Sequence, residues 1–105
     1  MAVAQTFDYS TSTLRAYALM DARDYRINAA QFLGTLKCES HFQWDAVSKT
    51  DDYGVAQINA KAHPDITRAQ ALNPYWSIDW AAQAFANGQQ RMWVCWRIKY
   101  GQLRE

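Results

Sequence analysis

The chain has 105 residues and a formal net charge of +1 at pH 7. Half of its residues are hydrophobic, 14% are aromatic and 20% are charged, which excludes a disordered chain. The balanced charge argues against a nucleic-acid partner, and no apolar run is long enough to span a membrane. We therefore expect one globular domain over residues 13–105, preceded by a flexible segment over residues 1–12.

Hydrophobic periodicity predicts a mainly helical chain with a small β element in the middle. The first helix is expected over about residues 13–23, with Thr11 and Ser12 as candidate caps. A second helix is expected to begin after Asn28, because Gln31 stands three residues further on, in the capping-box position.

The second helix carries an apolar stripe that includes the only internal glutamate of the chain. The i, i+3, i+4, i+7 pattern is formed by Ala29, Phe32, Leu33 and Leu36. Glu39 follows Leu36 by three residues and therefore projects from the same face. Burial raises the pKa of a carboxyl group, which suits a general acid. A glutamate that turns to water or pairs with an arginine is an equally weighted structural alternative.

Turn-forming residues occupy positions 45–52, and a short strand that Gly54 bends is expected within 53–59. A carboxylate in a polar loop stays ionised, so Asp52 could join Glu39 as the second of the two carboxyl groups used in glycosidic cleavage. An ordinary acidic turn is the alternative interpretation.

Three further helices are expected in the C-terminal half. Asp65 is a candidate cap for a short helix that ends before Pro74. Ser77 is a candidate cap for a helix that Gly88 ends, and the last helix is expected over about residues 90–99.

The aromatic residues could stack on sugars, but most of them, including Trp80, are expected in the core. Tyr75 and Trp76 follow Pro74 in an expected loop and are the better binding candidates. The histidines and acidic residues lack the spacing of a zinc or calcium site, so we expect no metal and no cofactor.

Cys38 and Cys95 permit one intramolecular disulfide. Two buried thiols in a cytosolic domain are an equally good interpretation. A bridge would close a loop over most of the chain, which stabilises the fold by about 4 kcal/mol in the entropic treatment. Residues 1–14 have neither the basic start nor the apolar run of a secretory signal.

Three motifs, in order along the chain, resemble the lysozyme superfamily. They are Cys-Glu-Ser-His-Phe at 38–42, Ala-Val-Ser at 46–48 and Asp-Tyr-Gly-Val-Ala-Gln-Ile-Asn at 52–59. Glu-Ser followed by Gly-x-x-Gln-Ile is similar to the soluble lytic transglycosylases. The third motif and Trp-Val-x-Trp-Arg at 93–97 are similar to c-type lysozymes. A cysteine before the glutamate, answered by Trp-x-Cys in the last helix, resembles the resuscitation-promoting factors. The likeness covers about residues 14–101.

This resemblance implies an α+β fold, mainly α, of the lysozyme type, with a small β-hairpin beside the catalytic helix. It also implies a disulfide between Cys38 and Cys95, which would hold the helix end that carries the catalytic residue. Glu39 would be the general acid, and Asp52 matches the second carboxylate of c-type lysozymes.

The resemblance also implies a set of residues around the substrate. Ser48 would support Glu39 by hydrogen bonding. Gln57 and Asn59 match positions that line the sugar groove, and Tyr53 would help to shape it.

The implied activity is cleavage of the β-1,4 bond between N-acetylmuramic acid and N-acetylglucosamine in peptidoglycan. A muramidase uses water, whereas a transglycosylase needs no second acid because a substrate hydroxyl attacks and leaves an anhydro sugar. The expected protein is a monomer that acts outside the cell, in the periplasm or at the cell wall, and is bacterial or phage-borne. A non-catalytic glycan- or protein-binding member of the same fold is the alternative.

Two features depart from these families. The loop between Glu39 and Asp52 is shorter than in c-type lysozymes. The aromatic-Asn-x-Gly signature of the transglycosylases is only approximated by Phe-Ala-Asn-Gly at 85–88.

Overall fold

The computed structural model describes residues 8–102, and over this range the chain is mainly helical with one small hairpin. In chain order the elements are α1 (Thr11–Asp24), α2 (Ala29–Ser40), β1 (Asp52–Tyr53), β2 (Ile58–Asn59), α3 (Arg68–Leu72), α4 (Pro74–Ala86), the 3-10 helix η1 (Gln90–Met92) and α5 (Val94–Lys99). The expected fold class, mainly α with a small hairpin, is confirmed. Most of the expected N-terminal segment, residues 1–7, lies outside the described residues, and α1 already begins within its last two positions.

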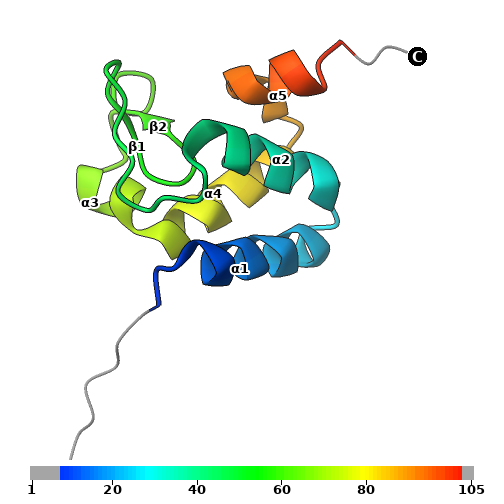
Figure 1. The fold of residues 1–105 in the computed structure, drawn as a ribbon. Coiled ribbons are helices and arrows are strands. Elements are labelled where there is room, and N and C mark those ends of the chain that lie inside the picture. Colours follow the sequence, from blue (N-terminus) through cyan, green and yellow to red (C-terminus); the bar gives the residue numbers. More distant parts are fainter. Residues whose placement is uncertain (1–7, 103–105) are drawn as a thin grey trace, which may run out of the picture.

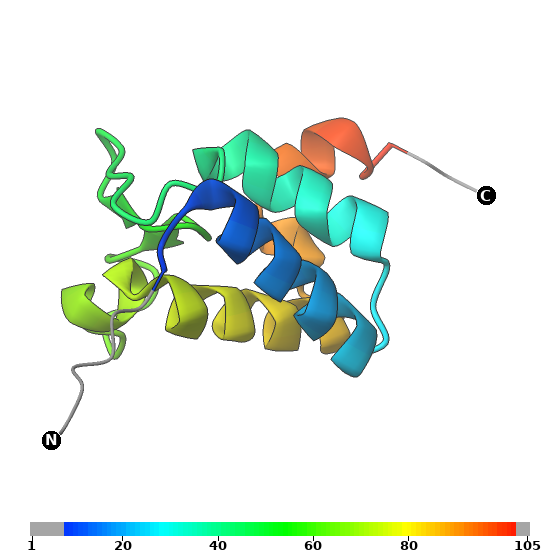
Figure 2. The same ribbon diagram turned by 60° about the horizontal axis from the view of Figure 1, so that its bottom comes forward.

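Helices α1, α2 and α4 run side by side and form the body of the domain (Figures 1 and 2). The hairpin and α3 lie at one end of this body, and α5 packs on the side of α2 away from α1 (Figure 1). The active-site candidates of the sequence therefore lie where the helical body meets the hairpin.

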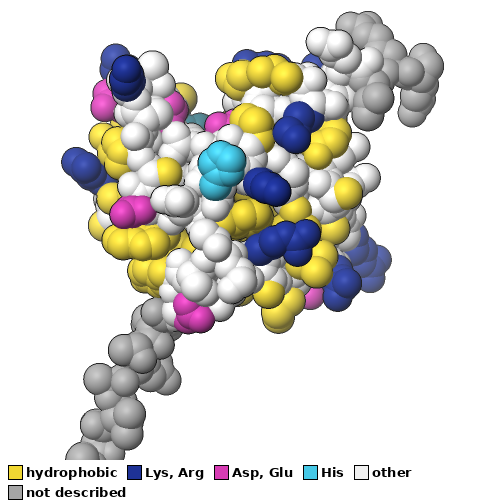
Figure 3. All heavy atoms as spheres, in the orientation of Figure 1, with side chains coloured by type: hydrophobic (Ala, Val, Ile, Leu, Met, Phe, Trp, Pro, Cys, Tyr) yellow, Lys and Arg dark blue, Asp and Glu magenta, His cyan; other side chains and the backbone are white. Residues whose placement is uncertain are grey.

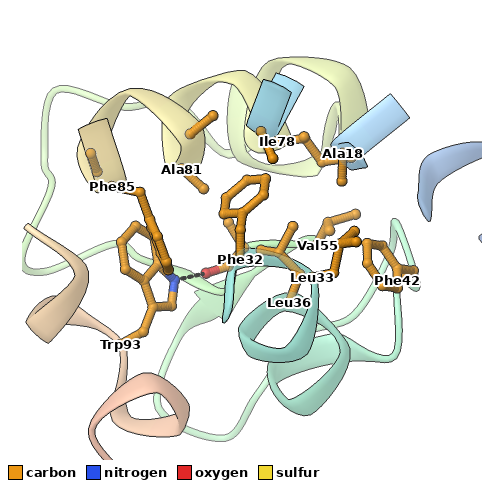
Figure 4. Packing of buried hydrophobic residues seen from close by; sticks show 14 of the residues in the cluster. Ala18, Phe32, Leu33, Leu36, Phe42, Val55, Ile78, Ala81, Phe85 and Trp93 are labelled. Atoms are coloured by element: carbon orange, nitrogen blue, oxygen red, sulfur yellow. Dashed lines mark hydrogen bonds between the residues drawn. The ribbon is translucent and has the colours of Figure 1, made fainter. Parts of the chain in front are cut away.

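The predicted apolar stripe of α2 forms the centre of the core. Phe32 is fully buried and meets Phe85 of α4 edge-on, with ring centroids 5.0 Å apart. Figure 4 shows Phe32 pointing toward the face of α4 that carries Ile78 and Ala81. Alanines on the facing helices, such as Ala18 of α1, leave room for this large ring. Burial of such apolar side chains is the main stabilising term in a domain of this size.

The first residues of α1 and α2 confirm one predicted N-cap and correct another. Asn28 caps α2, since its side chain accepts the backbone N–H of Gln31. The prediction of Thr11 or Ser12 as the cap of α1 was wrong, because Ser10 takes that position. The backbone at Ser10 is extended, whereas the two predicted residues already lie within the helix. Neighbouring hydroxyl residues are equally suitable as caps, so sequence alone did not choose among them.

Helix α4 begins four residues earlier than predicted. Asn73 caps it and Pro74 occupies its first turn, a position that suits proline because no N–H is needed there. The predicted cap, Ser77, is instead fully buried inside the helix, where its hydroxyl accepts the backbone N–H of Ala56. Ser77 therefore joins α4 to the hairpin rather than starting a helix.

Two other predicted helices also differ in detail. Thr67, not Asp65, caps α3, in a complete capping box. The helix expected over residues 90–99 is divided into η1 and α5 at Trp93, whose backbone is extended. The indole N–H of Trp93 donates to the carbonyl of Ala56, and this tertiary bond fixes the break.

The strand expected within residues 53–59 is in fact an antiparallel hairpin, in which Asp52 pairs with Asn59 and Tyr53 with Ile58. Its turn brings Gly54 against α3 with a φ of +79°. A side chain at Gly54 would overlap the carbonyl oxygen of Ala71. Glycine is therefore required here both for its backbone conformation and for the close approach of α3.

A buried acidic cluster lies between α1 and α4. Asp21 of α1 is only 7% exposed, and the hydroxyl of Tyr17 donates to Asp79 of α4 over 2.7 Å. Burial raises the pKa of Asp21 to about 8, and the hydrogen bond and charge of Asp79 act in the same direction. Asp21 is therefore protonated at neutral pH, which allows the two carboxyl groups to lie together.

Candidate active site

A pocket of about 330 Å³ lies between the hairpin, the end of α2, α4 and the start of α5. Its lining residues are Glu39, Asp52, Gln57, Ile58, Asn59, Ala62, His63, Trp80, Met92, Trp93 and Val94. Figure 3 shows the outline of the molecule indented between the hairpin and α5, both of which contribute residues to this lining. Four of the seven residues predicted for catalysis or substrate binding thus meet at one place: Glu39, Asp52, Gln57 and Asn59.

Glu39 lies in the last turn of α2 and is half-buried in the pocket wall. Its Oε2 accepts the backbone N–H of Cys95 over 3.2 Å. Burial raises the pKa of Glu39, and the negative charge of Asp52 adds to this effect. The N–H of Cys95 and the charge of Arg97 act in the opposite direction without cancelling it. The carboxyl group thus retains its proton to a higher pH than an exposed glutamate.

Asp52 lies in β1 and has a different electrostatic environment. Burial raises its pKa, but three hydrogen bonds outweigh burial and leave the pKa lowered. The hydroxyls of Ser48 and Thr50 each donate to Oδ2 over 2.6 Å, and the amide of Asn59 donates to Oδ1 over 2.9 Å. The expected hydrogen bond from Ser48 to Glu39 was wrong, because Ser48 binds this second carboxylate instead. The pocket therefore holds two carboxyl groups whose pKa values are shifted in opposite directions.

Hydrogen bonds join the turn of the hairpin to α2, to α4 and to the extended residue before α5, and this fixes the catalytic end of α2. The buried hydroxyl of Ser40 donates to the carbonyl of Val55 over 2.7 Å. The hydroxyl of Ser77 in α4 accepts the backbone N–H of Ala56. The indole N–H of Trp93 donates to the carbonyl of Ala56 (Figure 4). Because Ser40 follows Glu39 directly, its bond holds the end of the helix against the hairpin that carries Asp52.

The expected disulfide between Cys38 and Cys95 is present, with the two Cα atoms 6.0 Å apart. It joins α2 to α5 beside the pocket. Cys38 precedes Glu39 in the chain, and Cys95 supplies the N–H that Glu39 accepts. The covalent link and the hydrogen bond to Glu39 therefore involve the same two elements.

The predicted binding residues fall into two groups. Gln57 and Asn59 line the pocket, and the amide of Gln57 donates to the carbonyls of Ala46 and Gly54. Tyr53 lies outside the lining, with its ring 4.9 Å from the guanidinium carbon of Arg68.

Trp76 also lies outside the lining, half-buried on α4 against the core. Sugar-binding roles for Trp76 and Tyr53 remain predictions. They would apply to the part of a glycan chain that extends beyond the pocket.

The sequence interpretation missed the aromatic wall of the pocket. Trp80, predicted as a core residue, packs against the core with one side and lines the pocket with the other. Its ring meets His63 and Trp93 edge-on, at centroid distances of 4.9 and 5.8 Å. Trp76 and Trp80 both lie on α4, and helical periodicity alone does not say which of them borders a cavity. Trp93 belongs to one of the motifs in the sequence, but the motif did not predict that Trp93 lines the pocket.

Within residues 8–102, no group of three His, Cys, Asp or Glu side chains is arranged to hold a metal ion. Over the same range, no helix has both the length and the apolarity needed to cross a membrane. The titratable side chains that line the described pocket are Glu39, Asp52 and His63.

A family described as Transglycosylase SLT domain matches residues 16–97, which is most of the chain. The chain belongs to this family. The match spans the disulfide, the end of α2 and the hairpin, so membership in the lysozyme-like superfamily is confirmed. Searches of curated proteins and of solved structures found no match.

SLT domains are generally lytic transglycosylases, so membership indicates that this SLT domain binds and acts on peptidoglycan. A disulfide persists in oxidising compartments. Together, the SLT family and the disulfide indicate a location outside the cytoplasm.

Proposed function

We propose that this SLT domain cleaves the β-1,4 bond between N-acetylmuramic acid and N-acetylglucosamine, with Glu39 as the catalytic acid and base. The observation that carries the proposal is the half-buried carboxyl group of Glu39, with its raised pKa, in the wall of the 330 Å³ pocket. A protonated carboxyl group near neutral pH is what cleavage of a glycosidic bond requires, because the leaving alkoxide must receive a proton.

The proposed reaction returns Glu39 to its starting state. Glu39 first donates its proton to the glycosidic oxygen as the bond from that oxygen to C1 of the muramic residue breaks. The resulting carboxylate then accepts the proton of the C6 hydroxyl as O6 bonds to C1. The products are a strand with a free 4-hydroxyl group and a 1,6-anhydromuramic end. One residue serves both steps, and no water is consumed.

Asp52 would stabilise the positive charge that develops at C1. Its lowered pKa keeps it ionised, and hydrogen bonds on both oxygens hold its orientation. An ionised and oriented Asp52 carboxylate also favours a second candidate reaction, hydrolysis, in which Asp52 activates a water or attacks C1 itself. Family membership favours the anhydro route.

The rest of the pocket suits a sugar chain. Trp80 and Trp93 offer apolar ring surface, and the polar side chains of Gln57 and Asn59 stand on the hairpin side. Aromatic rings pack against the apolar faces of sugars, while polar groups orient their hydroxyls. The amide of Asn59 already binds Asp52, so its main effect would be to orient that carboxylate.

The test is digestion of purified peptidoglycan, with mass spectrometry of the new ends. Anhydromuramic ends are expected, and reducing ends would instead indicate hydrolysis. Glu39→Gln preserves the shape but has no proton to donate, so the rate should fall by a factor of about 100 to 10,000. Circular dichroism checks that the variant remains folded. An unchanged rate in Glu39→Gln would refute the proposed role.

Asp52→Asn separates the two routes. Under the anhydro route it should slow cleavage without changing the product, whereas under hydrolysis it removes the base or nucleophile. A wild-type protein that binds glycan strands yet releases no new ends would support the non-catalytic alternative.

A further inference from the structure

A second pocket, of about 220 Å³, lies between the first turns of α1 and the end of α2. Its lining residues are Thr11, Ser12, Arg15, Lys37, His41 and Phe42, and none of them lines the Glu39 pocket. Figure 3 shows a histidine with Lys and Arg side chains beside it over this part of α1 and α2. We call these six residues the basic pocket.

The basic pocket gathers positive charge without an acidic partner. Arg15 and Lys37 come from different helices and face the same cavity, and no Asp or Glu is among the lining residues. The first turn of α1 holds no acidic residue, and its helix dipole adds a positive potential at this end. Asp8, which precedes α1, does not line the pocket, and its carboxylate accepts hydrogen bonds from Ser10 and Thr13.

The helix dipoles account for only one of the two cations in the basic pocket. Lys37 lies in the last turn of α2, where a cation complements the negative end of the helix dipole. Arg15 lies in the second turn of α1, beyond the first turn in which the helix dipole acts, so no helix end accounts for its presence in the pocket. An anion in the cavity would offset the repulsion between the two cations, and the hydroxyls of Thr11 and Ser12 would add donors.

The two pockets share the end of α2. Lys37 stands two residues before Glu39 within α2, and two residues turn a helix by about 200°, so Lys37 projects from the opposite side. His41 follows the helix as its C-cap, in the left-handed conformation. A helix with its side chains is about 10 Å across, so the path around half of its circumference is about 16 Å, which about five extended peptide residues span. A short peptide attached to a sugar in the Glu39 pocket can therefore reach the basic pocket.

We propose that the basic pocket binds a carboxylate of the peptide stem carried by the muramic residue in the Glu39 pocket. This inference rests on the proposed function. The muramic residue bears its peptide through a lactyl group, and the stem has free carboxylates. Phe42 gives the cavity an apolar wall, which suits the aliphatic part of an amino acid better than a bare phosphate. The basic pocket would thus select glycan strands that still carry their peptides.

The test compares glycan strands that bear stem peptides with the same strands after an amidase has removed them. Binding is measured at equilibrium in a Glu39→Gln background, so that no strand is cut. The double substitution Arg15→Gln and Lys37→Gln should weaken binding of the peptide-bearing strands about tenfold and leave binding of the stripped strands unchanged. Arg23→Gln with Lys99→Gln is the matched control, because both are exposed cations outside the two pockets.

Several outcomes would overturn the inference. Equal loss on both kinds of strand would indicate general attraction of charge, and no loss would show that the basic pocket takes no part. Displacement by inorganic phosphate or poly(glycerol phosphate) as effective as displacement by free stem peptide would indicate a phosphate site.

A separate measurement keeps the inference distinct from the proposed activity. Free stem peptide is titrated into the wild-type protein, and the resonances of the His41 ring are followed by NMR. Shifts that disappear in the double variant support the basic pocket even if the wild-type protein cleaves nothing. The absence of shifts overturns the inference even if cleavage is observed.

Discussion

Replacing both Cys38 and Cys95 with serine removes the disulfide that joins α2 to α5. The two cysteines are separated by 57 positions in the sequence. In the entropic treatment, a loop of that length stabilises the folded state by about 4 kcal/mol. One kcal/mol corresponds to about 4–8 °C in the melting temperature of a domain of this size, so we expect a fall of roughly 15–30 °C.

The same substitution should change the active site. Without the disulfide, the six-residue α5 is held to α2 by packing and by the hydrogen bond from the Trp96 indole N–H to the Gln31 side chain, so the N–H of residue 95 is held less firmly on Glu39. That N–H lowers the pKa of Glu39, so its weaker hold leaves the effects of burial and of Asp52 less opposed, and the pKa rises further. The first step needs protonated Glu39. The basic limb of the pH–rate profile should therefore move to higher pH.

The assay has two parts, and each can fail separately. Thermal unfolding is followed by circular dichroism, and the pH dependence of anhydro-end release is measured below the melting temperature of the variant. Reducing agent should reproduce the loss in the wild-type protein and have no effect on the double variant. A fall of under about 5 °C would refute the loop-entropy reasoning. A basic limb that stays in place or moves to lower pH would refute the role of the Cys95 N–H.

Three further substitutions test the supports of the fold and the site. The pKa of Asp21 in the folded protein is about 8, above its value in the unfolded chain. Protonated Asp21 therefore stabilises the fold fully below about pH 4, and this contribution is lost as the pH rises to 8. Thermal melts of Asp21→Asn should lack this decline, and an unchanged decline would contradict the assignment. Ser40→Ala should lower the free energy of unfolding in urea by about 1–3 kcal/mol, because a buried hairpin carbonyl loses its donor. Ser40→Thr, which keeps the hydroxyl, is its control. Gly54→Ala should destabilise more than Gly88→Ala, since both have positive φ but only Gly54 faces a backbone oxygen, that of Ala71. Equal losses at the two glycines would show that the contact is unimportant.

Local patterns in the sequence were enough to predict the buried face and the cap of α2. The stripe on α2 predicted both the buried Phe32 and the half-buried Glu39, because a helix repeats every 3.6 residues whatever its surroundings. Asn28 was found as a cap for the same reason, since capping involves neighbours in the chain. Ser77 was misassigned because its hydroxyl binds the hairpin, 21 positions away, and no local rule contains that partner.

The sequence by itself determined the family motifs, the mainly helical class and an inward-facing glutamate beside a cysteine. Only the tertiary structure decided what surrounds that glutamate. Ser48 serves Asp52 rather than Glu39, Trp80 rather than Trp76 lines the pocket, and the N–H on Glu39 comes from 56 positions away. The physical reason is that the pKa of a carboxyl group depends on burial and on donors within a few ångströms, and those are brought together by packing between distant segments.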